Sequence, residues 1–227
     1  MIESGDYTCR SPPIIEPGTI TPYLACSSVI ACTHPAIRIC ARELIHDVDD
    51  EQERIDKLYT FVRDAVTHSG DAGRTELVWE PDEVISAGHA LCFGKSHLLT
   101  ALCRVVGIPA GLCYQRLRRS DGSYVLHALC AVWVEDGKKW QRLDARGNKP
   151  GINAFFSKTG EEHLAYPIFD DPGEWLDPHI YAEPWDTILH LLESSEDVAS
   201  FIDASEQIQT PPRHPYRTDI LTPVPVY

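Results

Sequence analysis

The sequence lacks any hydrophobic run long enough to cross a membrane, and its charge is mostly of one sign. No stretch of its 227 residues reaches the roughly 18–20 apolar residues of a membrane-spanning helix. Lysine and arginine number 20 against 34 acidic residues, and the formal net charge is -14. Because phosphate groups would be repelled by such a protein, we expect neither a nucleic acid nor an anionic membrane as its partner.

The beginning of the chain lacks the two parts of a secretory signal. Residues 1–18 carry acids and prolines where a signal has a basic segment followed by an apolar one. We therefore expect a cytoplasmic protein. Its eight cysteines are then expected to be free thiols, because the cytoplasm is a reducing compartment.

Motifs for cofactors are missing as well. The sequence has no Gly-rich phosphate loop and no nucleotide-binding motif, so no cofactor is expected. Cys26, Cys32, His34 and Cys40 lie close in sequence and raise the alternative of a zinc site. Their spacing contains no C-x-x-C pair, and Cys40 falls on a predicted helix face. We expect no metal and interpret these residues as core and surface side chains.

The composition that is present is typical of one globular domain. Hydrophobic residues make up 43% and charged residues 24% of the chain, which shows no internal repeat. Residues 1–22 are rich in proline and glycine and are expected to form an N-terminal arm. We expect a single catalytic domain over 23–195 and an extended C-terminal tail over 196–227.

Periodicity and turn signals predict helices packed on an antiparallel sheet, which is an α+β fold. The central helix begins near Cys92 and ends at Gly107, since glycine is favoured just after a helix and Pro109 prevents its continuation. Three strand-like runs joined by hairpin signals follow. The expected helices are 35–46, 50–66, 92–106 and 185–194, and the expected strands are 109–118, 124–134 and 139–144.

A cysteine, a histidine and an aspartate follow one another on these elements. Cys92 opens the central helix, where unpaired backbone N–H groups and the helix dipole stabilise a thiolate. His127 lies near the start of the second strand, and Asp144 closes the third. An imidazole within hydrogen-bond reach activates a thiol, and a third group fixes the tautomer of the imidazole. We interpret the three residues as nucleophile, general base and orienting acid.

Each of the three residues also has a simpler interpretation. Cysteines in this chain mostly suit small apolar core positions, a histidine on an apolar strand is often a structural core residue, and Asp144 suits a turn. Only the ordered set favours catalysis over these alternatives.

That set resembles the transglutaminase-like superfamily of cysteine enzymes. With "CYQRL" at 113–117 and "DARGNK" at 144–149, the chain resembles the small bacterial stand-alone members of that superfamily. The resemblance extends loosely from residue 30 to residue 156 and implies a papain-like core with Cys92, His127 and Asp144 in the three roles above. The family usually has glycine two residues before the cysteine, where this chain has Ala90. The matching residues are Cys92, "ALCRVVGIPAG" at 101–111, His127-Ala128, Trp140 and Leu143-Asp144.

Polar residues beside the triad are candidates for substrate binding. Gln115, Arg146 and Asn148 lie on segments next to it, and an arginine there could hold a carboxylate through two hydrogen bonds. Arg146 could equally pair with a carboxylate of the protein itself. His89 and His97 flank the nucleophile in sequence, and either could contact substrate.

Two functions from different classes follow. The first is a thiol enzyme that forms a Cys92 thioester with a peptide or small amide substrate. Water would resolve the thioester in a peptidase or amidase, and an amine would resolve it in a transglutaminase; hydrolysis is preferred because no calcium site or module for large protein substrates is evident. The second is a non-catalytic binding module with the same fold. The sequence indicates neither the substrate nor the oligomeric state.

Overall fold

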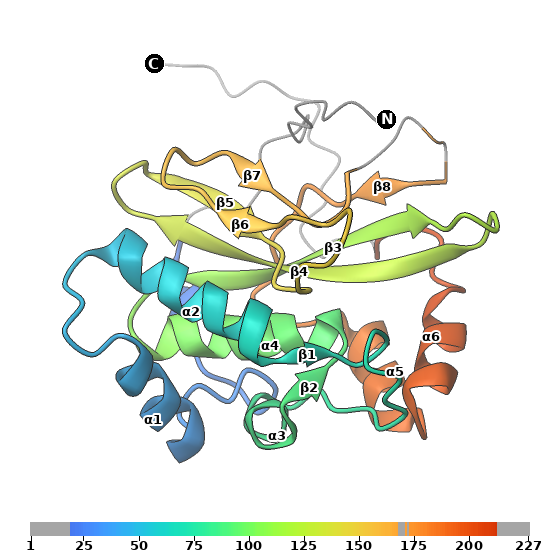
Figure 1. Cartoon of the computed structure of the whole chain (residues 1–227), viewed down its shortest axis with the longest axis horizontal. Helices are drawn as coiled ribbons and strands as arrows, with labels where there is room; N and C mark the ends of the chain where they lie inside the picture. Colours follow the sequence, from blue (N-terminus) through green and yellow to red (C-terminus); the bar gives the residue numbers. More distant parts are fainter. Residues whose placement is uncertain (1–18, 168–170, 172, 213–227) are drawn as a thin grey trace.

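The computed structural model describes residues 19–167, 171 and 173–212, in which helices pack on an antiparallel sheet (Figure 1). The expected α+β class is therefore confirmed. In chain order the helices are η1 (Thr21–Leu24, a 3-10 helix), α1 (Pro35–Leu44), α2 (Glu51–Ala65), α3 (Pro81–Ala87), α4 (Cys92–Val105), α5 (Asp186–Ser194) and α6 (Val198–Ser205). The strands are β1 (Thr67–His68), β2 (His89–Ala90), β3 (Ala110–Arg118), β4 (Tyr124–Val134), β5 (Lys139–Leu143), β6 (Phe155–Phe156), β7 (Glu162–His163) and β8 (Trp175–Leu176).

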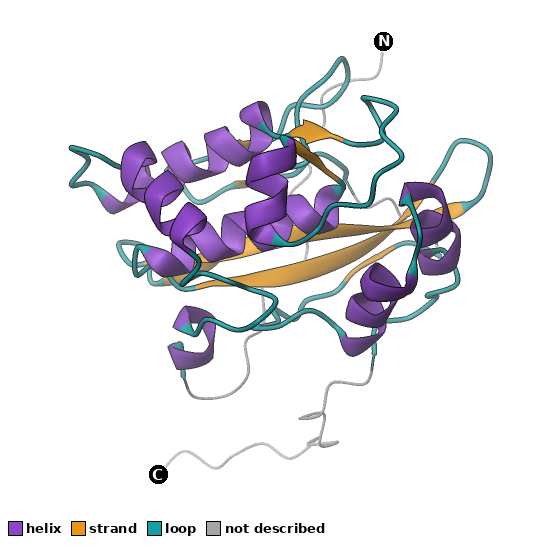
Figure 2. Cartoon of the chain, turned by 90° about the horizontal axis from the view of Figure 1, so that it is seen from below, coloured by secondary structure: helices purple, strands orange, loops and turns teal. Residues whose placement is uncertain are grey.

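The main sheet has the strand order β5-β4-β3-β8, with every neighbouring pair antiparallel. Helix α4 lies along β4 and β3, and helices α1, α2 and α3 pack against α4 (Figures 1 and 2). Helix α4 is consequently enclosed on all sides, and every residue from Cys92 to Arg104 is buried. The first turn of α4 is therefore fixed in position by the sheet on one side and by helices α1, α2 and α3 on the others.

The elements begin and end where their residues predict. Asp50 caps α2 by accepting a hydrogen bond from the backbone N–H of Glu53 at 2.8 Å. Gly107 follows α4 with a positive φ of 82°, a conformation that glycine adopts without steric cost. The turn at 120–123 joins β3 to β4 with the register Gln115↔His127. The expected helices and the three long strands are confirmed to within a few residues.

The expected tail of 196–227 begins instead with helix α6. Asp197 and Ser200 form a capping box at its start, and Phe201 is fully buried against Phe93, with ring centroids 4.9 Å apart. A helix of eight residues has too few turns to show a clear period in sequence, so only its docking on the core reveals it. The remainder of the expected tail, 213–227, and residues 1–18 of the expected arm lie outside the described residues.

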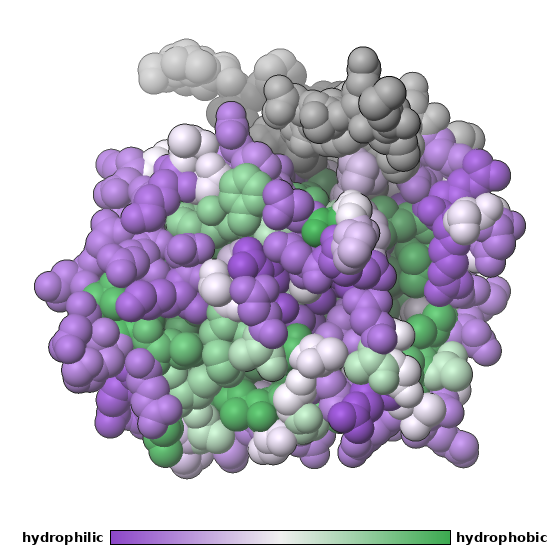
Figure 3. All heavy atoms as spheres, viewed as in Figure 1, coloured by the Kyte–Doolittle hydropathy of each residue, from purple (hydrophilic) through white to green (hydrophobic). Residues whose placement is uncertain are grey.

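Hydrophilic residues cover most of the face shown in Figure 3, with smaller hydrophobic areas between them. Within the described ranges, none of the helices combines the length and the hydrophobicity that a membrane crossing requires.

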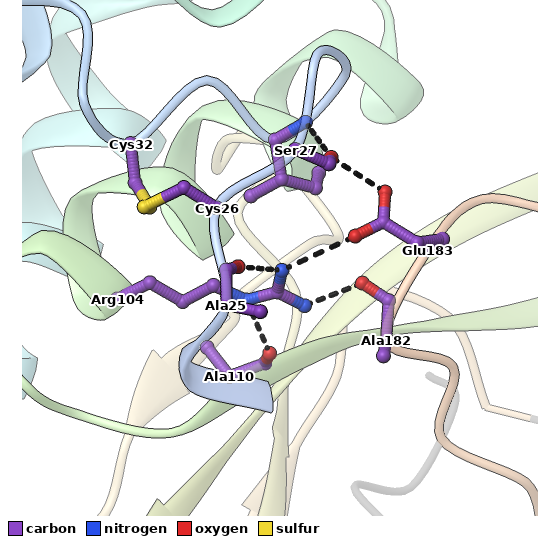
Figure 4. Close-up of a disulfide and its surroundings, with 9 residues drawn as sticks. Ala25, Cys26, Ser27, Cys32, Arg104, Ala110, Ala182 and Glu183 are labelled. Carbon is purple, nitrogen blue, oxygen red and sulfur yellow. Dashed lines mark hydrogen bonds and ion pairs between the residues drawn. A yellow bond between two sulfur atoms is a disulfide. The ribbon is translucent and has the colours of Figure 1, made fainter. Parts of the chain in front are cut away.

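The expectation of free thiols is wrong for two cysteines, because Cys26 and Cys32 are joined in a disulfide with their Cα atoms 5.3 Å apart (Figure 4). The disulfide lies beside Arg104, a fully buried residue of α4. The Arg104 guanidinium donates to the backbone carbonyls of Ala25, Ala110 and Ala182 and pairs with Glu183 at 3.5 Å. Sequence spacing alone cannot show that two side chains meet.

Candidate active site

Cys92 is the first residue of α4, and its side chain is enclosed, with 7% of the residue exposed. The N-cap residue, Leu91, has no side-chain oxygen to accept from the first turn. The backbone N–H groups of that turn have no intrahelical acceptor, so their positive ends face the thiol. Strand β2 leads directly into this helix and pairs in parallel with β1, which fixes the position of the cysteine relative to the end of α2.

His127 and Asp144 meet across the strands β4 and β5. The Nε2 atom of His127 lies 2.9 Å from Oδ2 of Asp144, in a buried ion pair. The same carboxylate accepts the backbone N–H of Ala165 at 3.0 Å through Oδ2 and that of Arg146 at 3.1 Å through Oδ1. Burial alone would raise the pKa of Asp144, but the charge and hydrogen bond of His127 and the two N–H donors hold it below its usual range. The carboxylate stays ionised and orients the imidazole.

Cys92 and His127 form an ion pair at neutral pH. Burial disfavours the thiolate, but the charge and hydrogen bond of His127, joined by a hydrogen bond from His68, outweigh it and lower the pKa of Cys92 to about 6. Burial likewise disfavours the imidazolium of His127, but Asp144 and the thiolate raise the pKa of His127 to about 10. Since Nε2 of His127 is bonded to Asp144, Nδ1 is the nitrogen that faces the sulfur. A thiolate therefore stands ready beside an acid.

The other free cysteines of the described part of the chain behave differently. Burial raises the pKa of Cys103, Cys113 and Cys130 above the ordinary thiol value, and burial together with Glu43 raises that of Cys40 to about 11. Among the five free cysteines that the structure describes, Cys92 alone has a lowered pKa.

Two aromatic rings that the sequence does not mark as functional complete the surroundings of the thiol. His68, at the end of β1, hydrogen-bonds Cys92 from a different element than His127. Tyr166 places its ring edge-on to His127, with centroids 5.2 Å apart. Both lie far from Cys92 in sequence and on segments without a strong pattern, so no spacing could have predicted them.

The side chains expected to bind substrate mostly form hydrogen bonds or ion pairs with other groups of the protein. Arg146 forms a bidentate ion pair with Asp71, one contact of which measures 2.8 Å. Asn148 bonds the backbone of Ala154 through both amide atoms, at 3.1 and 2.7 Å. Gln115 is fully buried and donates to the carbonyl of Tyr166 at 3.3 Å. The structure therefore gives Arg146 and Asn148 roles in holding loops around the triad.

Histidines 89 and 97 also have partners inside the protein. The Nδ1 atom of His89 lies 3.0 Å from Oγ of Ser69. His97 is buried with Nδ1 3.3 Å from the carbonyl of Trp79, and burial lowers the pKa of His97 to about 4. His97 is thus a neutral core residue.

Lys95 lies one turn after Cys92 and is fully enclosed. Its ammonium group donates to the carbonyls of Arg63 and Val66 at the end of α2, the former at 3.2 Å. Burial lowers the pKa of Lys95 to about 8, against the opposing attraction of Asp144. This lysine ties the end of α2 to the helix that carries the nucleophile. In the described residues no group of three His, Cys, Asp or Glu side chains suits a metal ion.

Comparison with known proteins adds a family and several structures. Residues 39–145 match the model of the transglutaminase-like superfamily, a range that contains Cys92, His127 and Asp144. None of the curated proteins compared with the chain matches it.

Solved structures that resemble the chain do so distantly. A putative cysteine protease from Cytophaga hutchinsonii is 19% identical, with a TM-score of 0.48 over 65% of this chain and 46% of that one. The periplasmic domain of TgpA from Pseudomonas aeruginosa, bound to ethylmercury, is 18% identical, with a TM-score of 0.44 over 57% and 49%. A putative protease from Parabacteroides distasonis is 16% identical, with a TM-score of 0.36 over 54% and 24%. The chain spans less than half the length of each of these structures.

Proposed function

Because this chain belongs to the transglutaminase-like superfamily through residues 39–145, we propose that it is a thiol enzyme acting on the carbonyl of a peptide or small amide. One observation carries the proposal: the Nε2 atom of His127 lies 2.9 Å from the Asp144 carboxylate, and the same imidazole lowers the pKa of the Cys92 thiol. This arrangement supplies the activated nucleophile and oriented base that acyl transfer through cysteine requires.

The chemistry follows from the resting ion pair. The Cys92 thiolate attacks the carbonyl carbon, and the C=O electron pair moves to oxygen. When this tetrahedral intermediate collapses, the C–N bond breaks and the His127 imidazolium donates its Nδ1 proton to the leaving amine. Asp144 stabilises the imidazolium through the 2.9 Å contact and keeps the ring in place for both proton transfers. His127 then takes a proton from a water molecule, whose oxygen attacks the thioester carbon. Collapse of this second tetrahedral intermediate breaks the C–S bond, releases the acid and restores the Cys92 thiolate beside the His127 imidazolium.

Hydrolysis is preferred over transfer to an amine, which would resolve the same thioester. The preference rests on the absence from the sequence of a recognisable module for large protein substrates. A binding module without turnover is the alternative, and a lowered thiol pKa speaks against it, because binding alone does not require a thiolate.

Trapping of the thioester tests the proposal. The protein is incubated with a peptide and amide library, with and without an added amine, and Cys92 is followed by mass spectrometry. We expect a transient mass increase on Cys92 that disappears on hydrolysis, and no such adduct on the Cys92→Ser variant. Cys40→Ser, which removes a half-buried thiol of raised pKa, serves as the matched control and should behave as the wild type. A library that yields neither adduct nor turnover, together with a thiol as slow to alkylate as Cys40, would favour the binding module.

A further inference from the structure

His68 lies beside the nucleophile without belonging to the triad. Its strand, β1, pairs in parallel with β2 so that His68 stands opposite Ala90, two residues before Cys92. The backbone N–H of Ser69 donates to the carbonyl of Ala90 at 3.0 Å, and those of Asp71 and Ala72 donate to the carbonyl of His68. The backbone of His68 is therefore fixed on both sides relative to the start of α4.

The imidazole of His68 lies close to the thiol, and one of its two nitrogens has no hydrogen-bond partner in the described part of the chain. An interaction with His68 is among the causes that lower the pKa of Cys92, while the Nδ1 atom of His68 is buried and has no hydrogen-bond partner among the residues that the structure describes. A buried nitrogen without a partner destabilises the folded protein unless a bound group supplies the missing hydrogen bond. Gly70 leaves room for the ring, since a Cβ atom at Gly70 would lie 3.3 Å from Cε1 of His68. Once Cys92 has attacked its substrate, the sulfur no longer carries the negative charge, and the carbonyl oxygen beside it becomes the acceptor for the His68 N–H.

The reaction needs a donor that the triad does not provide. Both nitrogens of His127 are in use, one on Asp144 and one on the sulfur and then the leaving group. The negative charge that develops on the carbonyl oxygen must be met by other N–H groups. The backbone at the start of α4 can give one donor. A second donor can come from a side chain that lies beside the thiol on another element, and His68, at the end of β1, is such a side chain.

We propose that His68 is a catalytic residue that donates a hydrogen bond to the oxyanion formed when Cys92 attacks its substrate. The inference rests on the proposed function and names the side-chain donor of that same site. As the S–C bond forms, the C=O electron pair moves to oxygen, and the His68 N–H binds the oxyanion without giving up its proton. As the oxygen regains its double bond, the C–N bond breaks and His127 protonates the amine.

Two reactions of the same thiol separate this role from simple stabilisation of the thiolate. Acylation by p-nitrophenyl acetate passes through an oxyanion and releases a phenolate that needs no proton. Alkylation by iodoacetamide displaces iodide at a saturated carbon and forms no oxyanion. Both rates are measured for the wild type, for His68→Leu, which has no donor, and for His68→Gln, which keeps an N–H donor. His89→Gln makes the same change in the paired strand β2 and serves as the control, and Cys92→Ser gives the background of the other thiols.

We expect His68→Leu to lose about 10²- to 10³-fold in acylation rate, the effect of removing one oxyanion donor. Its alkylation rate should fall less than about tenfold, His68→Gln should retain acylation within about tenfold of the wild type, and His89→Gln should match the wild type. Equal losses in both reactions, or no loss in either, would overturn the role of His68. A wild-type protein that alkylates fast and acylates, with His68→Leu unchanged, would overturn this inference alone. A wild type that does neither would overturn the proposed function and this inference with it. Melting curves of all variants show that each is folded.

Discussion

Single residues of one type differ in this protein according to what surrounds them. Cys130 is as buried as Cys92, yet its pKa is raised to about 12 while that of Cys92 is lowered to about 6. Burial acts on both in the same direction, so the difference comes from His127 and His68. The reactivity of a cysteine here is a property of its neighbours.

The pH dependence of the thiol follows from these values. Because the reactive species is the thiolate, alkylation of Cys92 should be near its maximum at pH 7 and fall as the pH drops through about 6. Acyl transfer to an amine-releasing substrate should also fall above about pH 10, where His127 loses the proton it must donate. Iodoacetamide labelling of Cys92 across pH 4–11, followed by mass mapping, measures the acidic limb of this profile, which is the fall in alkylation rate below about pH 6. In His127→Ala this limb should move up toward the ordinary thiol value of 9.0; an unmoved limb would show that His127 does not activate the sulfur.

Asp144→Asn should separate the orienting role from that of a turn residue. Two oxygens of Asp144 accept from three donors, and an amide NH₂ in place of Oδ2 would face the donors of His127 and Ala165. We expect a loss of about 1–3 kcal/mol in stability. We also expect a large loss of Cys92 reactivity, up to about 10⁴-fold in turnover by analogy with a serine-protease triad.

Thermal melting and alkylation rate measure the two effects of Asp144→Asn. Asp121→Asn is the control, since Asp121 is an exposed turn residue that accepts from Ser123, and it should alter neither quantity by much. Retention of wild-type reactivity by Asp144→Asn would remove Asp144 from the triad.

At the scale of elements, the close approach of α4 to the preceding segment depends on Gly94. A Cβ atom at Gly94 would lie 2.7 Å from the carbonyl oxygen of Val78, 2.9 Å from Cβ of Ala90 and 3.0 Å from Cα of Trp79. The family usually has glycine at the position of Ala90. In this chain Ala90 is fully buried, and the glycine that admits it stands one turn into the helix. Gly94 thus makes room within α4 for Ala90, which stands where the family usually has glycine.

Gly94→Ala should destabilise the protein although alanine is the better helix former. The gain in helix propensity is about 0.5–1 kcal/mol, whereas forcing backbone apart to admit a methyl group costs about 1–3 kcal/mol. We expect a lower Tm and a slower alkylation of Cys92, whose helix start would be displaced. The double variant Ala90→Gly/Gly94→Ala should recover only part of the Tm, because the contact with the Val78 carbonyl remains. A Tm at or above that of the wild type would contradict the close packing.

At the scale of the whole molecule, one buried arginine and one disulfide hold three distant segments together. Arg104 leaves α4 and binds the carbonyls of Ala25, Ala110 and Ala182, which come from the N-terminal segment, the start of β3 and the segment before α5 (Figure 4). Ser27 contributes a further contact, since its hydroxyl donates to Glu183 at 2.7 Å. The Cys26–Cys32 bond closes the loop that carries Ala25 and Ser27 to this cluster. Disulfides persist mainly in oxidising compartments, and the cytoplasmic location expected from the sequence stays a prediction.

Reduction of this disulfide should lower the Tm and leave the thiol chemistry in place. Closing a loop of this length stabilises a protein by about 2 kcal/mol in the loop-entropy model, which corresponds to roughly 4–8 °C for a chain of this size. Melting curves with and without dithiothreitol measure the shift. The variant Cys26→Ser/Cys32→Ser should melt at the lower temperature in both conditions and should alkylate at Cys92 as fast as the wild type. An equal Tm in both conditions for the wild type would show that the bond is not formed in solution.

The sequence by itself determined the α+β class, the main elements and the triad candidates, because these depend on local signals. The period of α2, the glycine that ends α4 and the hairpin turns between β3, β4 and β5 can each be read within a few residues. Cys92, His127 and Asp144 could be selected because the first begins α4, the second lies near the start of β4 and the third follows β5 directly.

Only the tertiary structure decided what stands around the thiol. His68 reaches Cys92 through the pairing of two-residue strands, Arg146 meets Asp71 across 75 positions, and Cys26 meets Cys32 through a loop without regular structure. Helix α6 exists because Phe201 packs on Phe93. These contacts join residues whose own neighbours in sequence carry no period, so their energy appears only when the chain has folded.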